Sequence, residues 1–513
     1  MYQMKISKIL YTIGLLLIMG LFTQCELDEI PQDALTSEQI TTTSDGLPSL
    51  VNGLYAIFMQ TDNNNGYIRQ YYQLSDFAGD NIVCAYKTED DLINGFRYED
   101  RSAEKSNINY FWEMSYKIIY GSNVAISMAD IKGDDPFTNQ LKGESYFLRA
   151  FATHNLVRLF AKPYSDANKS QPGVILREDK TDNMPKPRAT IDETYKYIIS
   201  SLLKAESLMS EEMPAERNND VHGFASIYSV WAELSRVYLY KNQLDSCILY
   251  SDKVINSGMF SLESAESFPD YFANAKSSSE SIWLIPYNLV DDQLNGSVAS
   301  MIFNGENCWA EEGATPSLLA DMGYGTEMVD IDQRWKYIVT DEPIVKNGVN
   351  MFYISTFSWQ DGSPTLSSPV MFRLAEIYLN RAEAFAKMGD VESAISDLNT
   401  LLENRLIVPE GGNLEDYLYS SGSLNGDIVD VVLRERRIEL AFEGHRIFDL
   451  LRNGKDIVRN YWGFHLDTYN GVPSGNAPGL DAPGVFYQNT DPNLIYPIPS
   501  SEISTNNLCQ PNE

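Results

Sequence analysis

The segment with the densest potential for acid–base chemistry is LRERRIELAFEGHRIFDLLRNG, residues 433–454. Within it, Glu439 and Glu443 stand four residues apart. Glycosidases hold two carboxyl groups roughly 5 to 9.5 Å apart across the scissile bond, so the pair could serve as catalytic acids. Acids on adjacent turns of one helix cannot easily straddle a sugar, however. Neighbouring arginines should also lower their pKa values, which is wrong for a general acid.

The same charges allow a structural interpretation of the segment. Four pairs of opposite charge stand three residues apart, namely Arg436 with Glu439, Glu443 with Arg446, Arg446 with Asp449, and Asp449 with Arg452. On a helix this spacing forms a ladder of mutually neutralising charges along one face. We therefore interpret the segment as a brace that locks this helix against the helix pair before it.

That helix pair is predicted in residues 371–390 and 391–406. Small and apolar residues recur there at helical spacing, and Gly389 and Asp390 break the run. Ala382 and Ala394 allow close approach of the two backbones, as in tetratricopeptide-type pairs. A weaker copy lies in residues 231–258. The distance between the copies suggests scattered helical pairs and not a continuous superhelix.

Other helices and long irregular connections complete the predicted organisation. Further helices are expected at about 46–60, 110–129, 140–160, 191–210, 225–241 and 244–257. Trp112, Trp231 and Trp283 are assigned to the core. Long irregular connections are expected at 63–109, 274–369 and 463–493, and such loops usually carry function.

Composition limits the classes of protein and partner. The chain has 513 residues and a formal net charge of -32. Its length suits one large or two to three ordinary domains. Its mean field repels nucleic acid and anionic membrane surfaces, so neither is an expected partner.

The N-terminus resembles a bacterial lipoprotein signal. Lys5 and Lys8 precede an apolar stretch, residues 9–22, which is too short to span a bilayer. Cys25 follows it as the expected lipidation site, although Phe22 and Gln24 are bulkier than the usual residues at such a site. Acyl chains such as palmitate on Cys25 would provide a membrane anchor. A plain secreted protein is the alternative.

The remaining cysteines and the known short motifs indicate neither a metal nor a cofactor. Cys84, Cys247, Cys308 and Cys509 are widely spaced and give no disulfide framework. Cys247 occupies a helix-packing position and is expected to be buried. Neither Cys-x-x-Cys, His-Glu-x-x-His, Gly-x-Ser-x-Gly nor a phosphate-binding glycine loop occurs.

Several motifs in order resemble the SusD/RagB family of outer-membrane lipoproteins. They are ESYFLRAFATHNLVRLFAKPYSD, RAEAFAKMGDVESAISDLNTLLENR, LRERRIELAFEGHRIFDLLRNGK and IYPIPSSEISTNN, together with an acidic linker after Cys25. The resemblance implies a mainly α fold with tetratricopeptide-like helix pairs and long irregular ligand-binding loops. It also implies a lipid anchor facing the cell exterior and a lid-like partnership with a TonB-dependent, SusC-like transporter. We expect a signal peptide at 1–24, an N-terminal region at 25–220 and a C-terminal region at 221–513, packed as one unit.

The resemblance moves the search for a site to loop aromatics with polar neighbours, because sugars pack on aromatic faces and bond to amide, carboxylate and guanidinium groups. Family members place ligand contacts in comparable loops. Trp309 and Trp359 are the principal candidates. The other candidates are Asn81, Phe96, Arg97, Tyr98, Asn304 and Tyr324.

The main hypothesis is a cell-surface lipoprotein that binds oligosaccharides or complex glycans and delivers them to the transporter, without enzymatic activity. Two alternatives remain open. The protein could be the peptide-binding lid of a similar transporter, or a surface glycosidase with acids from different loops.

Overall fold

The computed structural model describes residues 43, 45–62, 65–76, 78–84, 102–104, 106–218, 220–338, 343–346, 349–422, 424, 426–459 and 485–512. The expected signal peptide and Cys25 lie outside these residues. The chain forms two compact units, Met1–Leu50 and Val51–Glu513, and α3 (Gly46–Met59) crosses from one into the other. The fold below is that of the second unit. The predicted boundary near residue 220 stays a prediction.

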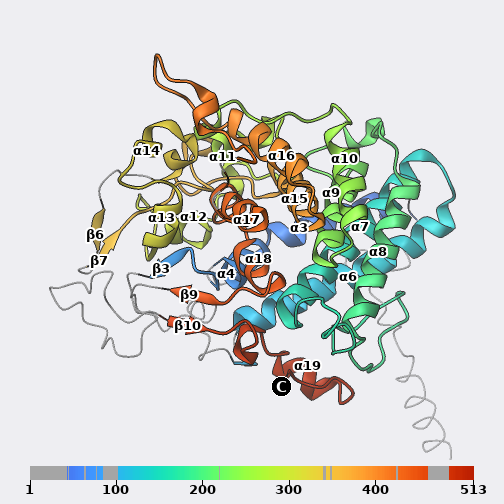
Figure 1. The fold of residues 1–513 in the computed structure, drawn as a ribbon. Helices are drawn as coiled ribbons and strands as arrows, with labels where there is room; N and C mark the ends of the chain where they lie inside the picture. The colour runs from blue at the N-terminus through green and yellow to red at the C-terminus, as the bar shows by residue number, and fades with distance from the viewer. Residues whose placement is uncertain are drawn as a thin grey trace, which may run out of the picture. The chain divides into compact units, whose positions relative to one another are not determined.

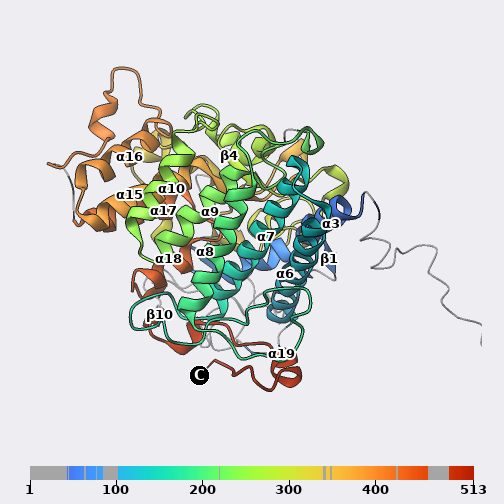
Figure 2. The ribbon, with the colours of Figure 1, turned by 90° about the vertical axis from the view of Figure 1, so that its right-hand side faces the viewer.

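A row of helices runs through this unit (Figures 1 and 2). Each helix packs against the next in the order α6 (Ser106–Lys132), α7 (Pro136–Phe160), α8 (Ile191–Leu208), α9 (Ile227–Tyr240), α10 (Leu244–Ile255), α15 (Leu374–Met388) and α16 (Val391–Glu403). The predicted mainly α fold and its long helices are confirmed. No helix of the described residues has both the length and the apolar character needed to cross a bilayer.

The expectation of scattered helical pairs is wrong. Helix α10 packs directly on α15, so the pairs α9–α10 and α15–α16 belong to one continuous row. Cys247 is fully buried at this junction, as predicted, and its thiol contacts the backbone oxygen of Asn380 at 3.5 Å. Asn380 also donates to Ser235 Oγ on α9. The intervening segment loops out of the row, so separation along the chain did not mean separation in space.

Local sequence signals set the helix ends. Asp135 caps α7 ahead of Pro136 in its first turn, and Thr190 forms a reciprocal capping box with Glu193 on α8. Helix α15 ends at Gly389, whose φ of 82° suits glycine, and Asp390 caps α16. These signals hold α15 and α16 antiparallel.

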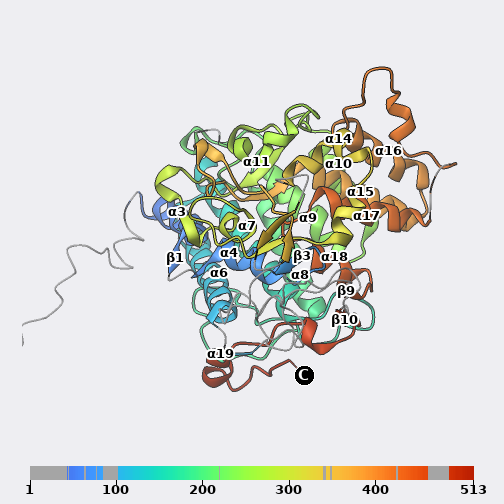
Figure 3. The same ribbon diagram turned by 90° about the vertical axis from the view of Figure 1, so that its left-hand side faces the viewer.

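Short elements lie before, between and after these helices, and the irregular yellow segments cover the side shown in Figure 3. Helices include α4 (Tyr67–Ser75), α11 (Tyr271–Asn274), α12 (Ala299–Ile302), α13 (Pro316–Asp321), α14 (Met328–Ile331) and α19 (Ser500–Thr505). Antiparallel strand pairs are β1 (Thr61–Asp62) with β2 (Asn65–Gly66), β3 (Ile82–Cys84) with β5 (Glu312–Ala314), β4 (Ser281–Leu284) with β8 (Val370–Arg373), β6 (Ile344–Lys346) with β7 (Val349–Met351), and β9 (Ile457–Arg459) with β10 (Val485–Tyr487).

An aromatic core lies where β4 and β8 meet the helix row. Trp283 is fully buried there, and its ring contacts Phe147 and Phe151 of α7 edge-on and stacks on Phe372 of β8. Trp112 and Trp231 are buried as well, so the assignment of these three tryptophans to the core is confirmed.

The single helix expected over residues 433–454 is two helices, α17 (Ile428–Glu439) and α18 (Arg446–Arg452). The chain between them turns sharply through positive φ values of 69° at Phe442 and 81° at Gly444. A Cβ atom at Gly444 would lie 2.6 Å from Cε1 of Tyr71 on α4. The close approach of a distant segment therefore fixes this turn.

The segment does act as a structural brace, but most of its ion pairs join it to other parts of the chain and do not form within one helix. Arg373 of β8 donates to Glu443 at 2.8 Å, to Glu439 at 2.5 Å and to Glu280 at 2.8 Å. Arg405, which follows α16, bonds to Glu439 and Glu280 as well. These buried charges tie α17 and its following turn to the β4–β8 pair.

Of the four predicted pairs, the ion pairs of the described residues include only Asp449 with Arg452, at 2.7 Å. Arg436 pairs with Asp449 at 3.2 Å, which was not predicted. Arg446 instead bonds to Asp80 at 2.5 Å. The turn between α17 and α18 rotates the side chains out of a common helical face, which explains why the other predicted pairs do not form.

Candidate functional site

The two acids that the sequence analysis weighed as a catalytic pair and set aside are not available to a substrate. Glu439 and Glu443 are both buried and bonded to Arg373. Arginines beside Glu439, chiefly Arg405, hold the pKa of its carboxyl below the ordinary value against the opposing effect of burial. Burial raises the pKa of Glu443, so the expectation of a lowered value is wrong for that residue. With their oxygens held by buried arginines, these acids brace the fold.

Two tryptophans differ from the buried ones. Trp309 is 46% exposed and Trp359 is 49% exposed. Large apolar side chains that remain half in solvent are common at ligand-binding surfaces, where a flat ring can cover the apolar face of a partner. These two are the principal residues predicted from the sequence.

Each exposed tryptophan stands on a turn with unusual backbone conformation. Asn307 and Ala310, which flank Trp309, have φ values of 60° and 51°. In the second turn Phe357, Trp359 and Asp361 have φ values of 65°, 72° and 52°. Positive φ at bulky residues costs roughly 1 to 3 kcal/mol each and persists where the surroundings enforce it, often at functional sites.

Buried hydrogen bonds hold the turn of Trp359 in place. The Trp359 backbone N–H donates to the Ser363 oxygen at 2.9 Å. Gln360 is buried, and its side-chain amide donates to the Tyr287 backbone oxygen at 2.7 Å and accepts from the Ser368 N–H at 2.8 Å. Gln360 therefore fixes the turn from below while the Trp359 ring remains exposed.

A third loop, residues 288–297, links the two turns. Its Asp292 carboxylate accepts hydrogen bonds from Ser363 Oγ at 2.5 Å and from Thr365 Oγ1 at 2.9 Å. Its Asn295 backbone oxygen accepts from the Trp309 indole N–H at 3.1 Å. The structure thus brings together the two predicted groups that contain Trp309 and Trp359. We name residues 288–297, 303–310 and 357–365 the two-tryptophan face.

Asn304 and Phe303 also belong to the two-tryptophan face. The Phe303 ring meets Trp359 edge-on, with centroids 5.6 Å apart and an interplanar angle of 84°. Asn304, one of the predicted ligand contacts, is exposed beside it. Asn304 thus directly follows the residue whose ring contacts Trp359, and its role as a ligand contact stays a prediction.

The other predicted residues lie elsewhere or outside the described residues. Tyr324 is partly exposed, but its ring stacks on Trp335 and meets Phe352 edge-on. Asn81 is 1% exposed and accepts a hydrogen bond from Arg437 Nε at 2.8 Å. Its side-chain carbonyl is therefore bonded inside the protein and does not face solvent. The described residues do not include Phe96, Arg97, Tyr98 and the lipidation candidate Cys25.

Sequence reasoning missed three exposed aliphatic residues on the two-tryptophan face. Leu289, Val290 and Leu294 all project from the loop 288–297. Their spacing has no helical or strand period, which was the available signal that they do not pack in a core. They add exposed apolar side chains to the loop that holds Trp309 through Asn295.

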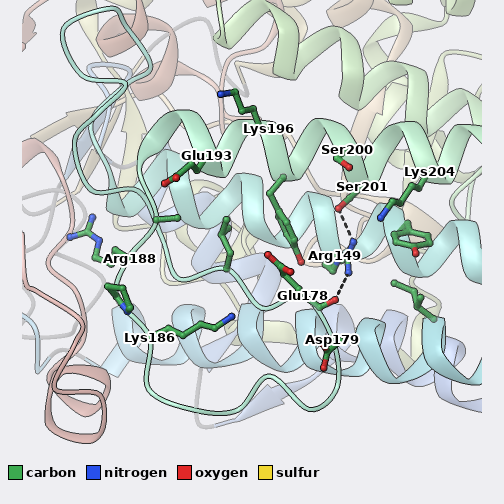
Figure 4. Close-up of a pocket in the computed structure, with 16 residues that line it drawn as sticks. Arg149, Glu178, Asp179, Lys186, Arg188, Glu193, Lys196, Ser200, Ser201 and Lys204 are labelled. Carbon is green, nitrogen blue, oxygen red and sulfur yellow. Dashed lines mark hydrogen bonds between the residues drawn. The ribbon is translucent and has the colours of Figure 1, made fainter.

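A groove of about 960 Å³ lies elsewhere, between α7, α8 and the segment before α8 (Figure 4). It was also missed, because its lining comes from four separate segments, with Ile126 of α6 as the fourth. Its residues are mainly charged and aromatic, and they include Tyr146, Arg149, Lys186, Tyr197 and Lys204. The described residues contain no cluster of His, Cys, Asp and Glu that could hold a metal ion.

Comparison with known proteins agrees with this fold. Residues 27–239 match a family model described as "Starch-binding associating with outer membrane", and residues 280–513 match the model of the SusD family. SusD-like protein P2 of Formosa agariphila is 26% identical, and the match covers 99% of each chain. SusD-like protein P38 of the same organism is 24% identical over 88% of this chain and 93% of its own.

Comparison with a solved structure also supports this fold. A SusD superfamily protein from Bacteroides thetaiotaomicron is 25% identical, with a TM-score of 0.76 over 91% of this chain and 99% of its own. Together the two family models cover the helix row except for α10, and they cover the segments that carry the two-tryptophan face. The chain belongs to the SusD family.

Proposed function

We propose that the protein is a cell-surface lipoprotein that binds neutral oligosaccharides on the two-tryptophan face and passes them to a TonB-dependent outer-membrane transporter without chemical turnover. The observation that carries this proposal is the pair of half-exposed tryptophans, Trp309 and Trp359, on constrained turns that one loop joins. The family description as starch-binding and associated with the outer membrane supports the ligand class and the location.

The chemistry of the face suits a sugar. An aromatic ring can pack on the apolar C–H face of a pyranose, while nearby amides and carboxylates bond to its hydroxyls. Asn304, Asn307 and Asp361 provide such groups beside the two rings. Because the turns are already held in place by hydrogen bonds, little conformational entropy is lost when a ligand binds.

Charge favours a neutral ligand. The three loops of the two-tryptophan face contain Asp291, Asp292, Glu306 and Asp361 but neither lysine nor arginine. In a chain of net charge -32, such a surface would repel polyanionic glycans at low salt. Neutral oligosaccharides encounter no such barrier.

The delivery role and the anchor rest on the family resemblance and on the sequence around Cys25. A lipid anchor at that residue would hold the protein at the outer membrane, beside a transporter that accepts the captured ligand. The proposal predicts co-purification with a TonB-dependent barrel from detergent-solubilised outer membranes.

Binding to a glycan array tests the ligand class, and a peptide library run in parallel tests the alternative. The proposal expects binding of neutral oligosaccharides with no release of new reducing ends. Binding of peptides alone would instead favour the peptide-capture alternative. Release of reducing ends would favour a glycosidase.

A further inference from the structure

The groove between α7 and α8 contains a buried arginine without an acidic partner. Arg149 of α7 is 5% exposed and lines the groove. Its guanidinium donates to Asn123 Oδ1 at 2.8 Å, to Ser201 Oγ at 2.9 Å and to the Glu178 backbone oxygen at 3.2 Å. All three acceptors are neutral. Within the described parts of the chain, no carboxylate oxygen lies within 4.0 Å of an Arg149 nitrogen.

Some buried arginines of this part of the fold have carboxylate partners. Arg217 bonds to Glu144 on α7 at 2.6 Å, and Arg236 of α9 bonds to Glu376 on α15 at 2.6 Å. A charge removed from water without a counterion destabilises the fold. Among the described residues, Arg158 of α7 also lacks a carboxylate partner and bonds instead to Tyr71 and Asn155, but Arg149 is the one of the two that lines the groove.

Aromatic rings partly compensate for this missing partner. The Arg149 Cζ atom lies 4.9 Å from the ring centroid of Tyr146 and 4.9 Å from that of Tyr197. Such contacts are favourable but do not neutralise the charge. Within the part of the chain that the structure describes, the buried guanidinium nitrogen Nε has no hydrogen-bond partner. An anion in the groove would supply the missing charge.

A second cation faces the same space. Lys204 of α8 extends toward the Arg149 side of the groove (Figure 4), with its Nζ 5.4 Å from the Tyr146 ring centroid. Among the described residues, no carboxylate lies within ion-pair distance of Lys204. Lys186, which projects into the groove from the opposite segment, is already paired with Asp182 at 2.5 Å.

The acidic residues of the lining do not supply the missing charge. Asp179 caps its own turn by accepting from the Thr181 N–H at 2.7 Å, and Glu193 belongs to the capping box at the start of α8. The Glu178 carboxylate lies at the groove but outside ion-pair distance of Arg149. Arg188 also lines the groove without a carboxylate partner in the described chain, but it bonds to backbone oxygens and to Asn512 at the end of the groove away from Arg149. Of the described lining residues, Arg149 and Lys204 are the two cations without a carboxylate partner that lie at the same end.

We propose that this groove is a second ligand site, one that binds an oxyanion through Arg149 and Lys204. Its size, about 960 Å³, is at the upper end of ordinary small-ligand cavities and would accommodate a short saccharide. Uronic-acid oligosaccharides and free sulfate share the required chemistry. This site is separate from the two-tryptophan face and does not depend on the function proposed for it.

Isothermal titration calorimetry with three probes tests the site: a trimer of galacturonic acid, its neutral methyl ester, and inorganic sulfate. The proposal expects the acid trimer to bind and the ester to bind at least about tenfold more weakly, the equivalent of one charge-assisted hydrogen bond. Binding of sulfate as well would define a simple oxyanion site, whereas binding of the trimer alone would define a sugar site. Failure of both anions to bind, or equal binding of acid and ester, overturns the proposal.

Substitutions distinguish anion binding in the groove from general electrostatic attraction to the protein surface. Lys204→Gln removes an exposed charge and should weaken anion binding about tenfold without loss of stability. Lys336→Gln removes an equally exposed charge from the 3-10 helix Gln333–Tyr337 and should have no effect. Trp309→Ala should also leave anion binding unchanged, so the outcome is independent of the two-tryptophan face. Unchanged affinity in Lys204→Gln would contradict the proposal even if the buried Arg149→Met variant fails to fold.

Discussion

The indole N–H of Trp309 donates to the backbone oxygen of Asn295 at 3.1 Å, so an exposed aromatic ring is held by the loop next to it. That same loop carries Asp292, which binds the turn of Trp359. The orientation of the two rings is therefore a shared property of three loops. This arrangement leads to predictions about the loops as well as about the rings.

Asp292→Ala should weaken glycan binding although Asp292 is not proposed to contact the ligand. The substitution leaves Ser363 Oγ and Thr365 Oγ1 without their common acceptor, so the turn of Trp359 loses about 1 to 3 kcal/mol of stabilisation. Calorimetric titration should show about a threefold to tenfold loss of affinity as the turn loosens.

The neighbouring residue offers a matched control for that experiment. Asp291 accepts a hydrogen bond from the Asn288 N–H at 2.8 Å within its own loop and does not bridge to the turn of Trp359 in the structure. Asp291→Ala removes the same charge without cutting the bridge. Equal losses of affinity in the two variants would show that charge, and not the bridge, controls binding.

Glu443→Ala should lower stability but not ligand affinity. Arg373 would lose its bonds to both oxygens of Glu443 while remaining buried, and breaking such a pair costs about 3 to 5 kcal/mol. Urea unfolding measures the loss, and titration at a temperature where the protein stays folded measures affinity. Arg434→Ala, at an exposed position of α17, should change stability by less than about 1 kcal/mol.

Asp76 should make stability depend on pH. Burial raises the pKa of this carboxyl from 3.8 to about 8, and its Oδ2 accepts from the Gly444 N–H at 2.5 Å. Between these pH values the folded state keeps a proton that the unfolded state releases. This group's contribution to stability is therefore largest at low pH and declines as pH rises toward 8, by about 1.4 kcal/mol per unit.

Asp76→Asn isolates that effect because it keeps an acceptor and removes the titration. The difference in unfolding free energy, variant minus wild type, should rise between pH 5 and pH 7.5. Asp134→Asn, at an exposed position before α7, should give a flat difference. A flat difference for Asp76→Asn as well would refute the assignment of a raised pKa.

Cys25→Ser should release the protein from membranes. If Cys25 carries acyl chains, wild-type protein expressed in a Gram-negative host will fractionate with the outer membrane and incorporate radiolabelled palmitate. The serine variant should do neither. Palmitate incorporation by the variant would place the anchor elsewhere.

Sequence periodicity predicted the long helices well, even though α7 is buried on nearly all sides. It failed where distant segments meet. The break between α17 and α18 follows from the close approach of Tyr71 to Gly444, and Asn81 is drawn inward by Arg437, 356 residues away along the chain. Neither of these two contacts can be predicted from local sequence.

The candidate site was likewise predictable only where it depends on local sequence. The exposure of Trp309 and Trp359 was predicted from their place in an irregular segment with polar neighbours. Their connection through Asp292 was not, because the bond to Ser363 spans 71 residues. The groove at Arg149 could not be predicted from the sequence either, because its lining residues alternate with core positions on α7 and α8.

Calorimetric titration of a neutral oligosaccharide selected from a glycan array into wild type, Trp309→Ala, Trp359→Ala and Tyr120→Ala tests the central claim most directly. Tyr120 is an exposed aromatic on α6 and serves as the control. Both tryptophan variants should bind at least about tenfold more weakly, with melting temperatures close to wild type, while Tyr120→Ala binds normally. Unchanged affinity in both tryptophan variants would contradict the account.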